Sequence, residues 1–203
     1  TMPVSPAATL ARKLRAKLGA EAVHTDNETL AGVAGDKWFA ARQPEIAVFP
    51  TTTAEVSATL ALAHKAGVPV TTRGAGYGYV GGCVPEHGGV VLSTARMNHI
   101  LEIHDRDFVA RVQPGVITGD LQEAVRRKGL FYPPDPASLK DCSLGGNIAT
   151  NAGGPRCLKY GVTRNYVLGL EVVLADGTIV PMGGRTHKNK TGFDLVGLFV
   201  GSE

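Results

Sequence analysis

Residues 71–82 read TTRGAGYGYVGG, with five glycines and two tyrosines directly after the apolar run GVPV. Successive glycines expose backbone N–H groups and adopt the left-handed angles that turn several of them toward one anion. Arg73 lies at the entrance of this loop and adds a positive charge. The pattern favours a phosphate-binding loop, and a merely flexible turn between two strands is the alternative.

Within this loop, residues 76–81 satisfy the pattern GxGxxG of dinucleotide-binding folds. That fingerprint requires a helix to begin at the glycines and a ribose-binding carboxylate about twenty residues later. The following residues, GCVPEHGG, exclude a helix, and the later stretch reads RMNHI. We therefore reject a Rossmann site, and no Gly-Lys-Ser/Thr triplet completes a P-loop.

A second segment, CSLGGNIATNAGGPRCLKYG at 142–161, alternates bare backbone with small hydroxyl and amide side chains. Such residues can follow an extended polar ligand closely and hydrogen-bond to it without steric bulk. The rigid PPDPAS stretch precedes this segment. Because buried polar groups need partners, the two segments together predict a large polar ligand.

The composition is that of a globular protein, with 43% hydrophobic and 19% charged residues. A scattered net charge of +3 gives no reason to expect nucleic acid, and membrane contact is expected only through a partner. Neither the three cysteines nor the six histidines show ligand spacing, so no metal site is predicted. Cysteine usage and the lack of a long apolar run favour a cytoplasmic protein.

The first elements follow from periodicity and caps. A helix is predicted from Pro6 to Leu18 after the cap Ser5, with a cleavable organelle presequence as the alternative, and a polar stretch follows to about Gly35. Residues 46–72 predict a β-α-β unit with parallel strands, and GGVVLST predicts a third strand. Thr1 before Met2 is unusual for a native start and suggests a fragment.

From residue 98 the pattern changes to hairpins. HILEIH and FVARVQPG predict one hairpin, TGDLQEAVRRKG a helix, and GLEVVLADGTIVPM a second hairpin that turns at Asp176-Gly177. The predicted class is α+β, with a small parallel β-α-β subdomain and a mainly antiparallel sheet with helices. The expected division is an N-terminal helix and lead-in at 1–40, a first subdomain at 41–97 and a second at 98–203.

Several motifs together resemble one family: RGAGYGYVGG, VQPGV, LFVGSE and the long block from LFYPPDPASLK to LADGTIV. They resemble the FAD-binding domain of the vanillyl-alcohol oxidase superfamily over about residues 40–203. The most similar branch is the flavin-carrying chain of bacterial glycolate oxidase, with the D-lactate and D-2-hydroxyglutarate dehydrogenases. The resemblance implies FAD bound between the two subdomains. The cofactor-binding residues that it implies are Arg73, Gly74, Ala75, Gly76, Tyr77, Gly78, Tyr79, Pro134, Asp135, Ser138, Ser143, Gly145, Gly146, Asn147, Thr150, Asn151, Gly153, Tyr160 and Gly161.

The sequence departs from the family loop, which commonly reads Arg-Gly-Ala-Gly-Thr-Gly-Leu-Ser, at Tyr77, Tyr79 and Val80. Relatives with covalent flavin carry a histidine at the position of Tyr77, so non-covalent FAD is expected. We expect both tyrosines to pack against neighbouring loops. The family's substrate domain, with its metal-ligating histidines, arginine and base, is expected beyond residue 203, and no catalytic residue is predicted within the chain.

The resemblance implies the FAD-binding portion of an enzyme that oxidises a D-2-hydroxy acid of the glycolate or D-lactate type. Hydride would pass to flavin N5 and electrons to a separate acceptor, for which an electron-acceptor subunit is a candidate partner. The small-molecule substrate would bind through the missing C-terminal domain. Two alternatives remain: a NADPH-dependent enolpyruvyl-sugar reductase on the same flavin fold, or a stand-alone flavin-binding module or subunit without catalytic activity.

Overall fold

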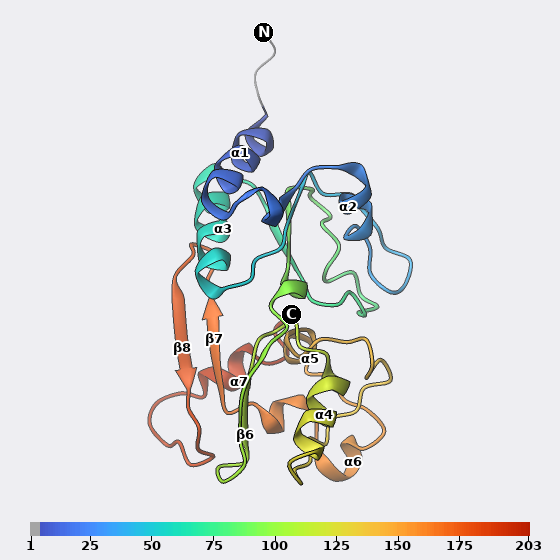
Figure 1. Ribbon diagram of the computed structural model, residues 1–203, viewed down its shortest axis with the longest axis vertical. Helices are drawn as coiled ribbons and strands as arrows, with labels where there is room; N and C mark the ends of the chain where they lie inside the picture. The colour runs from blue at the N-terminus through green and yellow to red at the C-terminus, as the bar shows by residue number, and fades with distance from the viewer. Residues whose placement is uncertain (1–4) are drawn as a thin grey trace. The chain divides into compact units, whose positions relative to one another are not determined.

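The computed structural model describes residues 5–203, so the unusual start at Thr1 lies outside the described residues. The chain divides into two compact units (Figure 1). The first comprises the residues up to Arg96 together with Val173–Val180, and the second comprises Met97–Val172 together with Pro181–Glu203. The segment 173–180 thus groups with the first unit, although the sequence placed it in the second subdomain.

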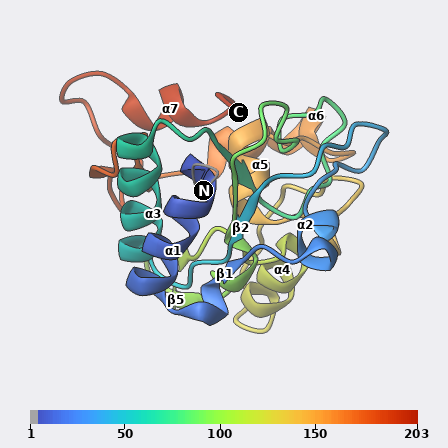
Figure 2. The ribbon, with the colours of Figure 1, turned by 90° about the horizontal axis from the view of Figure 1, so that it is seen from above.

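Two long helices of the first unit begin and end at local signals in the sequence. In α1 (Pro6–Leu18), the hydroxyl of Ser5 accepts a 3.1 Å hydrogen bond from the backbone N–H of Ala8, as predicted. In α3 (Thr53–Ala66), Thr52 caps the first turn and Gly67 closes the last one with a φ of 63°. The two helices lie side by side (Figure 2).

The first unit contains one four-stranded sheet. Its order is β1 (Val23–His24), β2 (Ile46–Val48), β4 (Val90–Ser93) and β3 (Val70–Arg73). Strands β2 and β3 are both parallel to β4, whereas β1 is antiparallel to β2. The predicted parallel β-α-β unit is therefore present, but its two strands are not neighbours, because the third strand inserts between them.

Alternate residues of the central strands face opposite sides of this sheet, as expected for the period of two in a strand. Ile46 and Val90 belong to the core beneath α1 and α3, whereas Ala47 and Val91 pack against Leu30. Leu30 lies in α2 (Asn27–Gly32), a short helix that the sequence analysis treated as part of a polar stretch. Its cap, the carboxylate of Asp26, was the local signal for it.

The second unit is built around an antiparallel hairpin, β5 (Ile100–His104) and β6 (Val109–Val112), and helix α4 (Thr118–Arg126), all as predicted. Leu121 and Val125 of α4 form its core with Val116 and Leu144. The α+β class is confirmed. The remaining elements are β7 (Gly169–Val173), β8 (Ile179–Gly183), α5 (Leu144–Thr150), α6 (Cys157–Tyr160), α7 (Leu195–Phe199) and the 3-10 turns η1 (Ala20–Ala22), η2 (Thr94–Arg96) and η3 (Thr163–Tyr166).

The turn between β7 and β8 contains the predicted Asp176-Gly177 pair, and its contact with α3 lies wholly within the first unit. Gly177 has a φ of 91°, and a Cβ there would lie 2.7 Å from the carbonyl oxygen of Ser57. The hydroxyl of Ser57 donates a 2.6 Å hydrogen bond to the Gly177 carbonyl. Among residues 5–203, no helix is both long and apolar enough to cross a bilayer.

Candidate cofactor site

The glycine-rich loop begins where β3 ends, and its conformation requires glycine at position 76. Gly76 has a φ of +76°, and a Cβ there would lie 2.2 Å from the guanidinium of Arg73. Side chains of L-residues rarely adopt this backbone region, and here one would also collide with a charged group. Gly78 differs, because a Cβ there would meet nothing within 4 Å.

Most backbone donors of this loop point to no protein acceptor. Within the described part of the chain, none of these N–H groups makes a hydrogen bond: Gly74, Gly76, Tyr77, Gly78, Tyr79 and Val80. Backbone N–H groups are obligatory donors that water or a ligand must satisfy where the protein does not. A run of free donors in a glycine loop fits an anion with several oxygens, such as a diphosphate.

The side chain of Arg73, which the resemblance placed at the cofactor, is held within the loop. Its Nη1 atom donates to the carbonyl oxygen of Gly35 and, at 3.4 Å, to the sulfur of Cys83. The guanidinium therefore ties the base of the loop to its far end and to a preceding segment. Burial raises the pKa of the Cys83 thiol above its usual value, although the charge of Arg73 opposes this.

The segment before β2 contacts the loop, which the sequence analysis did not anticipate. The backbone N–H of Gly81 donates to the carboxylate of Asp36 at 3.0 Å, and Lys37 places its ammonium 4.9 Å from the ring centroid of Tyr77. The ring of Trp38 meets the ring of Tyr79 edge-on at 5.6 Å. Both loop tyrosines thus pack against a neighbouring segment, as expected.

In the second unit, most of the expected flavin-lining segment is helical. Helix α5 begins after Ser143, whose hydroxyl accepts from the N–H of Gly146, and ends at Asn151 with a φ of 49°. The sequence analysis assigned no helix to residues 144–150, and their part in ligand binding stays a prediction. Gly145 serves close packing, because a Cβ there would lie 2.7 Å from Pro114.

The polar side chains of this segment have partners within the second unit. Asn147 is buried and donates through Nδ2 to the hydroxyl of Thr118 at 2.6 Å, and Thr118 lies 3.2 Å from the carbonyl oxygen of Cys142. Thr150 donates to the carbonyl of Gly146 at 3.1 Å, whereas Asn151 accepts from the backbone of η3. These groups fix the shape of the segment. Thr118 was missed, because a threonine that opens a helix gives no signal of its partner 29 residues away.

The proline-rich stretch is joined to the end of the same segment. Asp135 pairs with Arg156 at 3.1 Å and accepts from its backbone N–H, and a Cβ on Gly154 would lie 2.2 Å from the carbonyl oxygen of Asp135. Gln122 donates to the carbonyl of Pro134 at 2.7 Å. The structure thus brings Asp135 next to Gly154 and Arg156, whereas Pro134 is hydrogen-bonded to Gln122 of α4.

The remaining expected residues lie around this stretch. The carbonyl of Ser138 accepts from the backbone N–H of Cys142 at 2.8 Å and closes a turn before α5. Tyr160 is half-exposed and meets Phe131 edge-on, and Gly161 has a φ of +83°. Gly153 makes only ordinary contacts with its neighbours. The part of these four residues in ligand binding stays a prediction.

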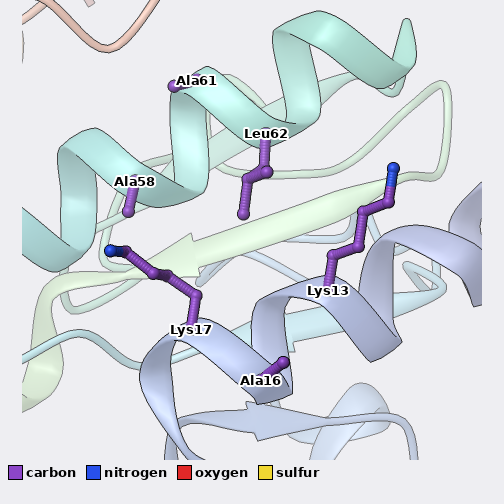
Figure 3. A pocket seen from close by; sticks show the side chains of 6 residues that line it. All are labelled: Lys13, Ala16, Lys17, Ala58, Ala61 and Leu62. Atoms are coloured by element: carbon purple, nitrogen blue, oxygen red, sulfur yellow. The ribbon is translucent and has the colours of Figure 1, made fainter.

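A separate groove between α1 and α3 contains none of the expected cofactor residues. It has an apolar floor with two lysine side chains at its rim (Figure 3). The lining residues are Lys13, Ala16, Lys17, Ala58, Ala61 and Leu62. In the described part of the chain, no three His, Cys, Asp or Glu side chains gather in a group that could hold a metal ion.

Comparisons with known proteins agree with the resemblance. A family model described as an FAD binding domain matches residues 44–183. The chain is 52% identical over 160 residues to the glycolate oxidase subunit GlcD of Bacillus subtilis, and 45% identical over 161 residues to the D-lactate dehydrogenase of Anaerostipes hadrus. Each alignment covers 79% of this chain and 34% of the relative, so the chain spans about a third of the length of these proteins.

The fold is also that of known flavoproteins. The structure of 4-ethylphenol oxidase from Gulosibacter chungangensis is similar with a TM-score of 0.81 and 29% identity, which covers 98% of this chain and 41% of that one. The structure of p-cresol methylhydroxylase gives a TM-score of 0.78 at 27% identity, over 95% of this chain and 40% of that one. The family match includes the glycine loop, the proline-rich stretch and α5. The chain therefore belongs to the FAD binding domain family.

Proposed function

We propose that this chain is the FAD-binding portion of an enzyme that oxidises a D-2-hydroxy acid of the glycolate or D-lactate type. The similarity to a glycolate oxidase subunit and to a D-lactate dehydrogenase supports this substrate class. The observation that carries the cofactor assignment is the run of free backbone donors around Gly76, within the matched family region. A possible electron-acceptor subunit is part of the proposal, because GlcD is named a subunit.

In this proposal, the diphosphate is held by the N–H groups of Gly74, Gly76, Tyr77, Gly78 and Tyr79. A diphosphate carries about two negative charges and is stabilised by backbone hydrogen-bond donors. Arg73 contributes its positive charge from within the loop rather than through a direct bond. The ring of Tyr77 lies beside Lys37, at the position where relatives with covalent flavin carry histidine. We therefore assign non-covalent binding.

The second unit supplies the surface for the flavin ring in this proposal. Gly146 and Thr150 lie one turn apart on α5, and a Cβ on Gly146 would meet only the hydroxyl of Ser143, at 3.2 Å. A face without bulk suits a flat ring, and the bond between Thr118 and Asn147 keeps the helix in place. When bound, FAD would supply a two-electron acceptor for oxidation of the substrate carbon, with N5 as the hydride-accepting atom and a separate acceptor for the electrons.

The first test is cofactor binding by the chain itself. Purified protein, freed of flavin and titrated with FAD in a calorimeter, should bind one FAD per chain and turn yellow. Denaturation should then release intact FAD into the filtrate. Protein that binds no FAD under these conditions contradicts the assignment, and flavin that stays with the denatured chain contradicts non-covalent binding.

The second test concerns the reaction and is done with the full-length protein. Anaerobic stopped-flow mixing with glycolate or D-lactate should bleach the flavin absorbance, whereas NADPH should not. Bleaching by NADPH alone would identify a reductase of the enolpyruvyl-sugar type. Flavin that no donor reduces would identify a binding module without its own activity, and either result overturns the proposed reaction.

A further inference from the structure

Four contacts join residues 36–38 to the glycine loop, and we call this group the clasp. Asp36 accepts from the N–H of Gly81 at 3.0 Å, and the N–H of Lys37 donates to the carbonyl of Gly78 at 3.3 Å. The ammonium of Lys37 lies over the Tyr77 ring, and Trp38 meets the Tyr79 ring edge-on. The clasp therefore contacts the loop at 77, 78, 79 and 81, which overlaps the run of free backbone donors.

Burial of apolar surface alone does not explain why the side chains of the clasp contact the loop. Trp38 and Tyr79 are each 61% exposed, so both rings remain largely in water. Large aromatic side chains gain most of their stabilisation from burial, and an exposed pair keeps its geometry through its specific edge contact. A lysine over an aromatic ring at the surface is likewise a specific electrostatic contact. The arrangement holds one loop against another rather than filling a core.

A glycine-rich loop without such contacts samples many conformations, because glycine restricts the backbone least. Ordering that loop around a ligand then costs conformational entropy at the moment of binding. Contacts that order the loop beforehand reduce this cost and slow the release of the ligand. Here Arg73 ties the base of the loop to Gly35 and Cys83, and the clasp ties its tip.

We infer that Lys37 and Trp38 are positioning residues for the cofactor, which act through Tyr77 and Tyr79. They hold the loop with its N–H groups exposed and thereby set the rate at which FAD dissociates. This inference rests on the proposed function, since it takes the loop as the diphosphate site. It also accounts for the two tyrosines, because the threonine and leucine of the common family loop lack a ring to receive either contact.

The test measures FAD release from loaded protein after dilution into excess apo-D-amino acid oxidase, which binds free FAD. Trp38→Ala and Tyr79→Leu should each speed release by about three- to tenfold, the range expected for loss of one aromatic contact. Trp38→Phe, which keeps a ring edge, should restore most of the wild-type rate. Lys37→Met, which removes only the charge from the contact with Tyr77, should also speed release.

Phe39→Ala is the matched control. Phe39 is 83% exposed and packs on Trp38 with ring centroids 4.7 Å apart, but within residues 5–203 it makes no ring contact with the loop. Its removal also deletes an exposed aromatic ring, yet should leave the release rate within about twofold. Thermal melts of the flavin-free variants should match wild type, because these side chains lie at the surface.

A second readout does not depend on flavin. Trp38 is the only tryptophan in the chain, so intrinsic emission reports directly on the clasp. In flavin-free protein, Tyr79→Leu should shift the Trp38 emission to longer wavelength and speed proteolytic cleavage between residues 74 and 82. Phe193→Ala, a change at a fully exposed ring in the second unit, should do neither.

The outcomes separate this inference from the proposed function. If wild type binds FAD and Gly76→Val does not, the loop assignment stands. Wild-type release rates in Trp38→Ala and Tyr79→Leu, with unchanged proteolysis, would then overturn the clasp alone. If wild type binds no FAD, or Gly76→Val binds it normally, the proposed diphosphate site fails first.

Discussion

The side-chain amide of Asn147 and the hydroxyl of Thr118 form a 2.6 Å hydrogen bond in which both residues are buried. This bond joins the start of α4 to the middle of α5. The hydroxyl of Thr118 also lies within hydrogen-bond distance, 3.2 Å, of the carbonyl oxygen of Cys142, just before α5 begins. One hydroxyl thus fixes the helix that we assign to the flavin ring, without lying in the motifs that suggested FAD.

Replacement of Thr118 by valine keeps the shape of the side chain but removes the hydroxyl. The amide of Asn147 then loses its partner in a buried place, which should lower the free energy of unfolding by about 1–3 kcal/mol. Urea denaturation measures this change. Thr150→Val removes an exposed hydroxyl from the same helix and should cost less than about 0.5 kcal/mol. Equal losses in the two variants would contradict the role given to the buried bond.

Substitutions in the glycine loop should separate strain within the protein from contact with the ligand. Gly76→Val should abolish FAD retention, because a β-branched residue is strained at a φ of +76° and its side chain would displace the Arg73 guanidinium. Gly78→Ala introduces a methyl group that meets no protein atom within 4 Å. Any weakening of FAD binding in this variant would therefore come from contact between the methyl group and FAD. Gly184→Ala, also in open space, is the control and should bind FAD normally. Calorimetric titration of the three variants with FAD shows whether each glycine is needed for the loop conformation or for contact with FAD.

The phenol of Tyr132 should lose its proton only at an unusually high pH. Burial raises its pKa from the usual 10.0 to about 12. The native state then holds the proton more tightly than the unfolded chain, so the contribution to stability is complete below pH 10 and is lost as the pH rises toward 12. The loss should amount to about 3 kcal/mol. Stability curves at alkaline pH should be flatter for Tyr132→Phe than for wild type or for the surface variant Tyr79→Phe, and parallel curves would contradict this assignment.

The three thiols should react with DTNB in a fixed order. Cys157 is exposed and should react first, whereas Cys142 is buried and should react only on unfolding. Cys83 is half-buried with a raised pKa, so little of it is thiolate at neutral pH and its reaction should be slow. Single replacements by serine assign each kinetic phase. A fast phase that survives Cys157→Ser would show that the loop around Cys83 opens readily.

The sequence by itself determined the elements whose signals are local. Ser5 caps α1, Gly67 ends α3, and Asp176-Gly177 turns the second hairpin, because each of these features depends on residues within a few positions of one another. The glycines of residues 74–82 likewise indicated a loop with exposed donors, since their freedom is intrinsic to the residue type. The sequence motifs were also specific enough to indicate the family.

Only the tertiary structure decided which distant residues meet. Strand β4 lies between β2 and β3, although it follows both in the chain, because pairing depends on the whole sheet rather than on any one strand. Helix α5 forms despite two glycines in its first turn, since Pro114 packs against the bare backbone. Thr118 and Trp38 find partners 29 and 41 residues away, and local spacing rules carry no information about contacts at such separations.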